Sequence, residues 1–252
     1  MRKSTHDVWL AGVDGCRFGW IAAFVKPSGK TGRVAVFKHF VEILEQKERP
    51  SHVVVDIPIG LPKYSPRKGR LAEGEIRQLI GARRSSVFRV PSRSAVYAGV
   101  DPSIPNDAKR YRKARGIARK TSIDRKAFSK QGFYLFPKIV EVDKLLRANK
   151  RFARRVYETH PEFAFWRLNG ERVLRHPKKS SAGINLRKRI LIKSNVASER
   201  VKSLPPRGAK IDDLLDALAC AIIARRINAG KAKPFPDPPE HDAYGLPMAI
   251  WA

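Results

Sequence analysis

Three short apolar runs near the start of the chain constrain its fold more than any other feature. They cover residues 8–13, 19–25 and 33–40, they are rich in residues that favour strands, and short glycine-containing breaks separate them. Such runs with such short connections predict an antiparallel meander.

A fourth run has a different character. Residues 41–48 alternate apolar and acidic side chains at helical spacing, and after Pro50 the run Val53–Ile57 is continuous and β-branched except for Asp56. Such a run is typical of a parallel strand buried on both faces. We therefore expect an α/β fold with a mixed sheet, in which three antiparallel strands precede parallel ones and helices flank the sheet.

The rest of the chain extends this pattern. Helical spacing is visible in residues 71–80, 139–152, 185–196 and 211–227, and residues 155–159 predict another strand. The 252 residues are expected to form a single domain, with a basic insertion over 62–130 that is rich in Pro, Gly, Ser and Arg, and a C-terminal tail over 228–252.

The charge balance restricts the partners of the chain. Lys and Arg number 52 against 23 Asp and Glu, a formal net charge of +29, and most of the excess lies in residues 63–210. Such a surplus predicts an anionic partner, and nucleic acid is favoured over anionic lipid or a ribosomal surface.

Cysteine usage and the N-terminus bear on location. Two cysteines, Cys16 and Cys220, are too few for a disulfide framework or a zinc ribbon. The first apolar run stops at Asp14, which is too early for a signal peptide or a membrane span. We expect a cytoplasmic protein that does not associate with membranes.

Two acids stand within or beside the predicted strands. Asp14 interrupts an apolar run before Gly15, and an Asp-Gly turn between two strands is an equally good interpretation. Asp56 follows Val53–Val55 at a strand end, where open α/β sheets place their chemistry. A charge there is costly to bury unless a metal or another cation offsets it.

A third acidic feature begins the last clear helix. Asp216 lies on the same side of the helix as Asp212 and Asp213, because the spacing is three or four residues. Asp212 and Asp213 can simply complement the positive helix N-terminus. Asp216 lies in the second turn and gains little from it, so we expect this helix to pack against something cationic.

The order of these features resembles the RNase H-like superfamily. More specifically, the chain resembles the family called domain of unknown function 429, whose members are predicted RNase H-like nucleases. The motifs that carry the resemblance are GVDGCRFGW (12–20), DIPIGLP (56–62), RRSSVF and PSR (83–93), KIVEVD (138–143), ETHPE (158–162) and DDLLDALA (212–219).

The resemblance implies a two-metal site for Mg²⁺ or Mn²⁺. Asp14 would take the first-strand position, Asp56 the second, and Asp213 and Asp216 the last-helix positions. Holliday-junction resolvases, whose last helix is most similar, usually have Glu at the second position. Hard divalent cations take several oxygen ligands, and two metals about 3.5–4 Å apart can activate water and neutralise charge on a phosphate.

Further candidates surround these acids. Glu158 at a strand end is either another metal ligand or catalytic base, or a structural partner of an arginine; His160 and Glu162 lie near it in sequence. Phosphate-binding donors are expected in Arg83, Arg84 and Ser85, and in Lys178 and Lys179. Five aromatic residues among the basic ones are candidates to stack on unpaired bases or to anchor the core: Tyr97, Tyr111, Phe128, Phe133 and Tyr134.

Three functions remain open from the sequence. The leading hypothesis is a metal-dependent nuclease that hydrolyses phosphodiester bonds of DNA or RNA. The second is a nucleic-acid-binding protein whose RNase H-like acids are vestigial. The third is an actin-like or sugar-kinase-like ATP-binding protein, for which the required second phosphate loop is missing.

Overall fold

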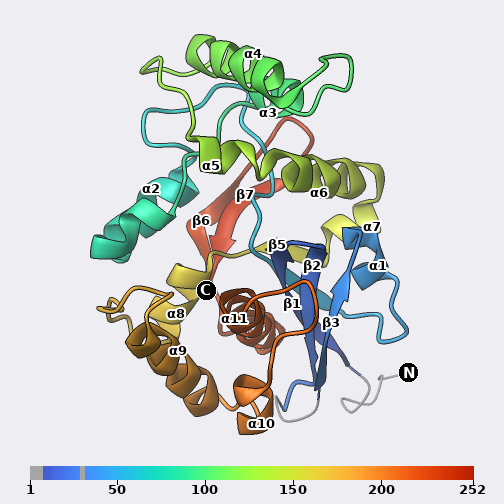
Figure 1. Cartoon of the computed structure of the whole chain (residues 1–252), viewed down its shortest axis with the longest axis vertical. Helices are drawn as coiled ribbons and strands as arrows, with labels where there is room; N and C mark the ends of the chain where they lie inside the picture. The colour runs from blue at the N-terminus through green and yellow to red at the C-terminus, as the bar shows by residue number, and fades with distance from the viewer. Residues whose placement is uncertain (1–7, 29–31) are drawn as a thin grey trace. The chain divides into compact units, whose positions relative to one another are not determined.

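The computed structural model describes residues 8–28 and 32–252 (Figure 1). The strands are β1 (Leu10–Cys16), β2 (Gly19–Val25), β3 (Gly32–Phe37), β4 (His52–Val55), β5 (Val156–Glu158), β6 (Pro234–His241) and β7 (Pro247–Trp251). The helices are α1 (Phe40–Leu44), α2 (Leu71–Leu79), the 3₁₀ helix η2 (Gly81–Ser86), α3 (Arg93–Ala98), α4 (Asp107–Lys120), α5 (Lys130–Phe133), α6 (Phe136–Ala148), α7 (Lys150–Ala153), α8 (Pro161–Leu168), α9 (Ser181–Lys193), α10 (Ser198–Lys202) and α11 (Ile211–Asn228).

The strands form one mixed sheet in the order β3-β2-β1-β4-β5-β7-β6. β1, β2 and β3 pair antiparallel, whereas β4 lies parallel to β1 and β5 lies parallel to β4. The prediction of an α/β fold, with an antiparallel meander followed by parallel strands and flanking helices, is confirmed.

Helix α11 is the centre of the hydrophobic core. It contacts β1, β2 and β4 as well as α8 and α9, and Figure 1 shows it among these elements. The sequence predicted a helix with one apolar stripe, but every residue from Leu214 to Ala224 is buried. The all-round burial arises because the small side chains between the large ones are also covered.

Along the described chain, no helix has the length and apolarity needed to cross a membrane.

Helix α11 approaches the backbone of β1 closely at Gly12. A Cβ atom at this position would lie 1.9 Å from the backbone nitrogen of Ala221 and 2.3 Å from the carbonyl oxygen of Ala217. Such distances are far below van der Waals contact, so only glycine allows this backbone-to-backbone packing. The middle of α11 is thereby held against β1.

The chain divides into two compact units, where the sequence predicted one domain. The first unit contains residues up to 56, residues 154–233 and the last two residues; the second contains 57–153 and 234–250. The expected insertion over 62–130 lies within the second unit.

The segment expected to be a tail over 228–252 contains β6 and β7. The proline-rich sequence of β6 carries no strand signal, and prolines are tolerated there because β6 is an edge strand.

The second unit has its own core of aromatic side chains. Tyr111, Phe128, Phe133 and Phe136 contact one another with ring centroids 4.7–6.5 Å apart. Phe128 and Phe133 are buried, so they anchor this core and are not accessible to bases. The sequence left open whether such aromatic residues stack on bases or anchor the core, and Phe128 and Phe133 anchor the core.

Candidate functional site

Three acids lie at the carboxyl ends of neighbouring parallel strands. Val13 of β1 pairs with Val55 of β4, and Val55 pairs with Glu158 of β5. The backbone nitrogen of Asp56 donates to the carbonyl of Val13 at 3.0 Å. Asp14, Asp56 and Glu158 therefore share one edge of the sheet, the edge at which α/β folds place ligands.

Asp14 belongs to β1 itself. It pairs with Ile21 of β2, and its Oδ1 accepts a hydrogen bond from the backbone nitrogen of Gly15 at 2.7 Å. The alternative of an Asp-Gly turn is wrong, because the strand continues to Cys16 and reverses after it. Only 8% of Asp14 is exposed.

Helix α11 brings further acids to this edge. The Oδ2 of Asp213 accepts from the backbone nitrogen of Lys210 at 2.8 Å, which caps the first turn. Oδ2 of Asp213 thus has the structural role that the sequence allowed for this residue, and its Oδ1 takes no part in that hydrogen bond. Asp216 is buried, with 3% exposed, and caps nothing. Its charge acts on the strand acids, since both Asp14 and Asp56 have their pKa raised by it.

The cation packed against this helix is Lys178. Its Nζ lies 3.1 Å from Oδ2 of Asp216 and 3.9 Å from Oδ2 of Asp212. Burial lowers the pKa of Lys178, but the charges of Asp216, Asp14 and Asp212 outweigh this effect and raise it. The sequence placed Lys178 among nucleic-acid contacts; here its ammonium group is bonded within the carboxylate cluster.

Burial, with smaller effects of neighbouring charges, holds the pKa values of these carboxyl groups high. Burial, together with the charges of Asp56, Asp216 and Asp213, raises the pKa of Asp14 well above its ordinary value. Burial and Asp216 raise the pKa of Asp56 to about 8, against the opposing effect of Lys178. Burial also raises the pKa of Asp216 to about 6. If all three were ionised, their negative charge would exceed what Lys178 can neutralise.

A buried ion pair borders the cluster. Nη2 of Arg187 on α9 donates to both carboxylate oxygens of Glu162 on α8, at 2.7 and 2.8 Å. Only 2% of Arg187 is exposed. Glu162 is therefore a structural acid, and this pairing was missed because nothing in the sequence connects residues 25 positions apart on different helices.

The chemistry of these donors fits a hard divalent cation. All are carboxylate oxygens, which Mg²⁺ and Mn²⁺ prefer, and they come from three strand ends and one helix. Within residues 8–28 and 32–252, however, no three His, Cys, Asp or Glu side chains are arranged to hold a metal ion. An ion would require the carboxylates to turn toward one another. The best-placed ligands are Asp14, Asp56 and Asp216, with Asp213 and Glu158 beside them.

The other predicted nucleic-acid contacts lie on surfaces. Arg83, Arg84 and Ser85 belong to η2 in the second unit, where Arg84 and Ser85 are exposed. Lys179 is exposed in the first unit, next to Lys178. The exposed side chains Arg84, Ser85 and Lys179 are accessible to phosphate. Arg84 and Ser85 belong to the second unit, whereas Lys179 belongs to the first.

Comparison with known proteins gives one match. A family model described as "Protein of unknown function (DUF429)" matches residues 12–241. Neither the curated proteins nor the solved structures include a significant match.

Proposed function

The chain belongs to the DUF429 family, and from the chemistry of its carboxylate cluster we propose that it is a metal-dependent nuclease. The proposed substrate is DNA or RNA, and the proposed reaction is hydrolysis of a phosphodiester bond. RNase H-like ancestry is part of the proposal, because acids follow the first strand, a parallel strand and the last helix in the order of that superfamily. Two buried free thiols, Cys16 and Cys220, fit action in a reducing compartment such as the cytoplasm.

One observation carries the proposal. Asp14, Asp56 and Asp216 are brought together from separate elements, with pKa values raised by burial and by neighbouring carboxylates. A fold gains nothing in stability from unneutralised like charges. Such a cluster is favourable where the protein binds a cation, and perturbed acids of this kind concentrate at functional sites.

The proposed ligands are Asp14, Asp56, Asp213 and Asp216, with Glu158 as a further ligand or a base. Bound Mg²⁺ or Mn²⁺ would activate water and neutralise charge on the scissile phosphate. The protein's own contribution is to fix the carboxylates on a rigid strand edge and to exclude bulk water from Asp14 and Asp216.

Lys178 has a specific place in this proposal. Its ammonium group supplies one positive charge, which is fewer than the number of carboxyl groups in the cluster. Because its pKa is raised, it stays protonated at neutral pH. It can hold Asp216 until a metal binds, or remain beside the metal and contact the phosphate.

The alternative is a nucleic-acid-binding protein with a vestigial site. The absence of a preformed group of three ligands among the described side chains favours it. Under this alternative Lys178 is a permanent counter-ion of Asp216 and added Mg²⁺ changes nothing.

Cleavage assays test the proposal directly. Purified protein should cleave single-stranded or double-stranded DNA, RNA or a branched junction in Mg²⁺ or Mn²⁺ and be inactive in EDTA. Asp14→Asn should lower the rate by several orders of magnitude, because a buried first-strand ligand is lost. Asp107→Asn, on an exposed acid of α4, is the matched control and should cleave at the wild-type rate. Cleavage of no substrate in either metal, or full activity in Asp14→Asn, would overturn the enzyme hypothesis.

A further inference from the structure

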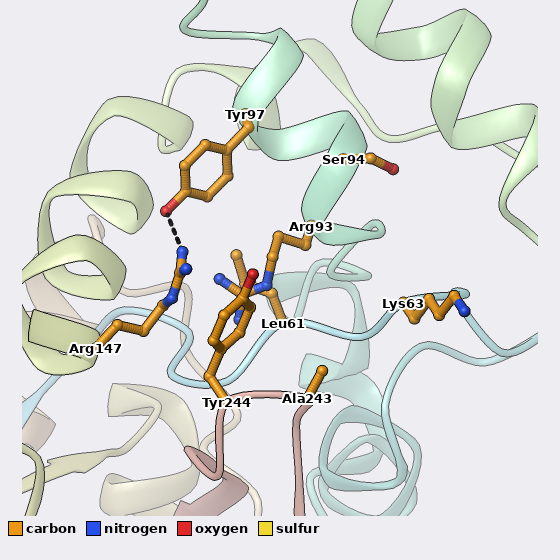
Figure 2. Close-up of a pocket in the computed structure, with 8 residues that line it drawn as sticks. All are labelled: Leu61, Lys63, Arg93, Ser94, Tyr97, Arg147, Ala243 and Tyr244. Carbon is orange, nitrogen blue, oxygen red and sulfur yellow. Dashed lines mark hydrogen bonds between the residues drawn. The ribbon is translucent and has the colours of Figure 1, made fainter.

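The second unit contains a cavity of about 400 Å³ that the proposed cleavage site does not use (Figure 2). This volume is within the range of small-ligand pockets. Its walls come from the segment after β4, from α3, from α6 and from the turn between β6 and β7. The lining residues are Leu61, Lys63, Arg93, Ser94, Tyr97, Arg147, Ala243 and Tyr244.

A buried network behind the cavity fixes one of its cations. Arg93 donates from Nη1 to Oδ2 of Asp143 at 2.5 Å and from Nη2 to Oδ2 of Asp242. The side chains of Asp143 and Asp242 are 2% and 0% exposed. Both carboxylates are turned to Arg93 and neither lines the cavity, so the cavity wall carries cations and no acid.

Tyr97 extends this network to a second cation. Its hydroxyl donates to Oδ2 of Asp143 at 2.6 Å and accepts from Nη1 of Arg147 at 3.3 Å, the bond drawn in Figure 2. Burial and the bond to Asp143 raise the pKa of Tyr97, so the phenol remains a donor. Nη2 of Arg147 has no hydrogen-bond partner among the described residues and can therefore bind a ligand.

An exposed aromatic ring lies between the cations. The ring of Tyr244, with 54% of the residue exposed, has the guanidinium carbon of Arg147 at 3.5 Å and that of Arg93 at 4.6 Å from its centroid. In Figure 2, Tyr97 and Arg147 lie on one side of Tyr244, and Lys63 and Ser94 on the other. Lys63 is exposed and makes no ion pair among the described side chains, and its Nζ lies 5.8 Å from the centroid of the Tyr64 ring.

We propose that this cavity binds one unpaired nucleotide of a nucleic-acid strand. The base would contact the exposed part of Tyr244, and the phosphates on its two sides would meet Arg147 and Lys63. A nucleotide within a strand has this order of groups: anion, aromatic ring, anion. Arg147 would donate from Nη2 to a phosphate oxygen, a charge-assisted hydrogen bond of the strong kind. The net charge of +29 favours a nucleic acid over a small aromatic carboxylate.

The inference shares only its partner class with the proposed nuclease, and it needs no metal. The binding experiment is therefore done with the full chain in EDTA, by calorimetric titration. The probes are adenosine 3′,5′-bisphosphate, adenosine 5′-monophosphate, adenosine, inorganic phosphate and a single-stranded hexanucleotide. We expect the bisphosphate to bind at least tenfold more tightly than adenosine or phosphate, and the hexanucleotide at least as tightly as the bisphosphate.

Variants locate the binding. Arg147→Met, Lys63→Met and Tyr244→Leu should each weaken the bisphosphate at least fivefold. Lys63 and Tyr244 are exposed, so their variants are expected to fold. Arg112→Met and Tyr134→Leu remove the same groups from exposed positions outside the cavity and should change affinity less than twofold.

Several results would overturn the proposal. They are the absence of saturable binding by every probe, equal binding of phosphate and bisphosphate, and equal losses in Arg112→Met and Arg147→Met. If the mononucleotides bound tightly and the hexanucleotide did not bind, the ligand would be a free nucleotide and the proposal of a nucleic-acid strand would be wrong. Failure of these tests would leave metal-dependent cleavage standing, and failure of cleavage would leave this site standing.

Discussion

The two units both bury charged groups, but acids outnumber cations in the first cluster and match them in the second. In the first, Asp14, Asp56 and Asp216 face a single ammonium group, that of Lys178. In the second, Arg93 lies between two carboxylates, and a further guanidinium group stands beside them. A bound cation would therefore stabilise the first cluster when its acids are ionised. The acids of the second cluster are already neutralised by its own arginines. Removing an acid should have opposite effects on stability in the two places.

The largest expected effect is in the second unit. Oδ1 of Asp242 accepts from the backbone nitrogens of Tyr244 and Leu246, and Oδ2 accepts from that of Leu61 and from Arg93. Asp242→Ala leaves all of these donors without the carboxylate and should lower the free energy of unfolding by about 3–5 kcal/mol, measured by chemical denaturation.

The control for this variant is Asp237→Ala, an exposed acid of β6. It should cost less than about 0.5 kcal/mol. Equal losses in the two variants would mean that the Arg93 network does not support the second unit, and the contrast with the first cluster would be lost.

The next effect is the pH dependence of stability in EDTA. The folded pKa values of about 8 for Asp56 and about 6 for Asp216 exceed the ordinary value of a carboxyl group. Between pH 5 and 8 the folded state thus holds more protons than the unfolded state. Stability should fall as pH rises, by up to about 1.4 kcal/mol per pH unit for each proton. Denaturation curves at several pH values measure this slope, and a flat or rising profile would contradict the raised pKa values.

A smaller change with a reversed sign is expected for Asp56→Asn. Neutralising this acid relieves repulsion, so without divalent ions the variant should melt at the wild-type temperature or above it. It should gain less from Mg²⁺, because stabilisation by a ligand grows as RT ln(1 + [L]/Kd) and its Kd is weaker.

The opposite control is Asp124→Asn in the second unit. Asp124 accepts two hydrogen bonds from Nη1 of Arg89, at 2.7 and 2.9 Å. This variant should melt lower than wild type, with an unchanged Mg²⁺ response. A lower melting temperature for Asp56→Asn in EDTA, together with no Mg²⁺ shift in wild type, would remove support for the metal site.

The smallest effect concerns surface charge. Changing Arg83 and Arg84 together to Ala should weaken nucleic-acid binding equally for all sequences and lower the slope of log affinity against log salt by about 1–2. Fluorescence anisotropy over a range of salt concentrations measures both. The same change at the exposed Lys38 and Lys47, outside the basic region 63–210, should have less effect. Affinity independent of salt would exclude binding mainly to phosphate.

The strands of the first part of the sheet could be predicted, because runs of apolar residues in the sequence mark them. β2 has the predicted bounds, β1 begins two residues and ends three residues later than predicted, and β4 begins one residue and ends two residues earlier. The acids Asp14, Asp56 and Glu158 could be placed at strand ends, because parallel strands bring their carboxyl ends to one edge.

The pairings between distant segments could not be predicted. The partner of Asp216 is a lysine 38 positions earlier, in a loop without regular spacing. Arg93 meets carboxylates 50 and 149 positions away. Such contacts depend on how helices dock, which neither propensity nor periodicity records. β6 was missed because its prolines lower strand propensity, although an edge strand accommodates them.

The contact at Gly12 has a consequence for how this core can change. In most strand–helix contacts, side chains separate the two backbones. When core residues are substituted, these side chains repack and the distance between strand and helix changes. At Gly12 the backbone of β1 meets the backbone of α11, so atoms common to every amino acid set the spacing. Asp14 is two residues further along β1, and Asp216 precedes Ala217, whose carbonyl group faces Gly12. The hydrophobic residues around this contact can therefore diverge widely while the separation of the two carboxylates stays the same.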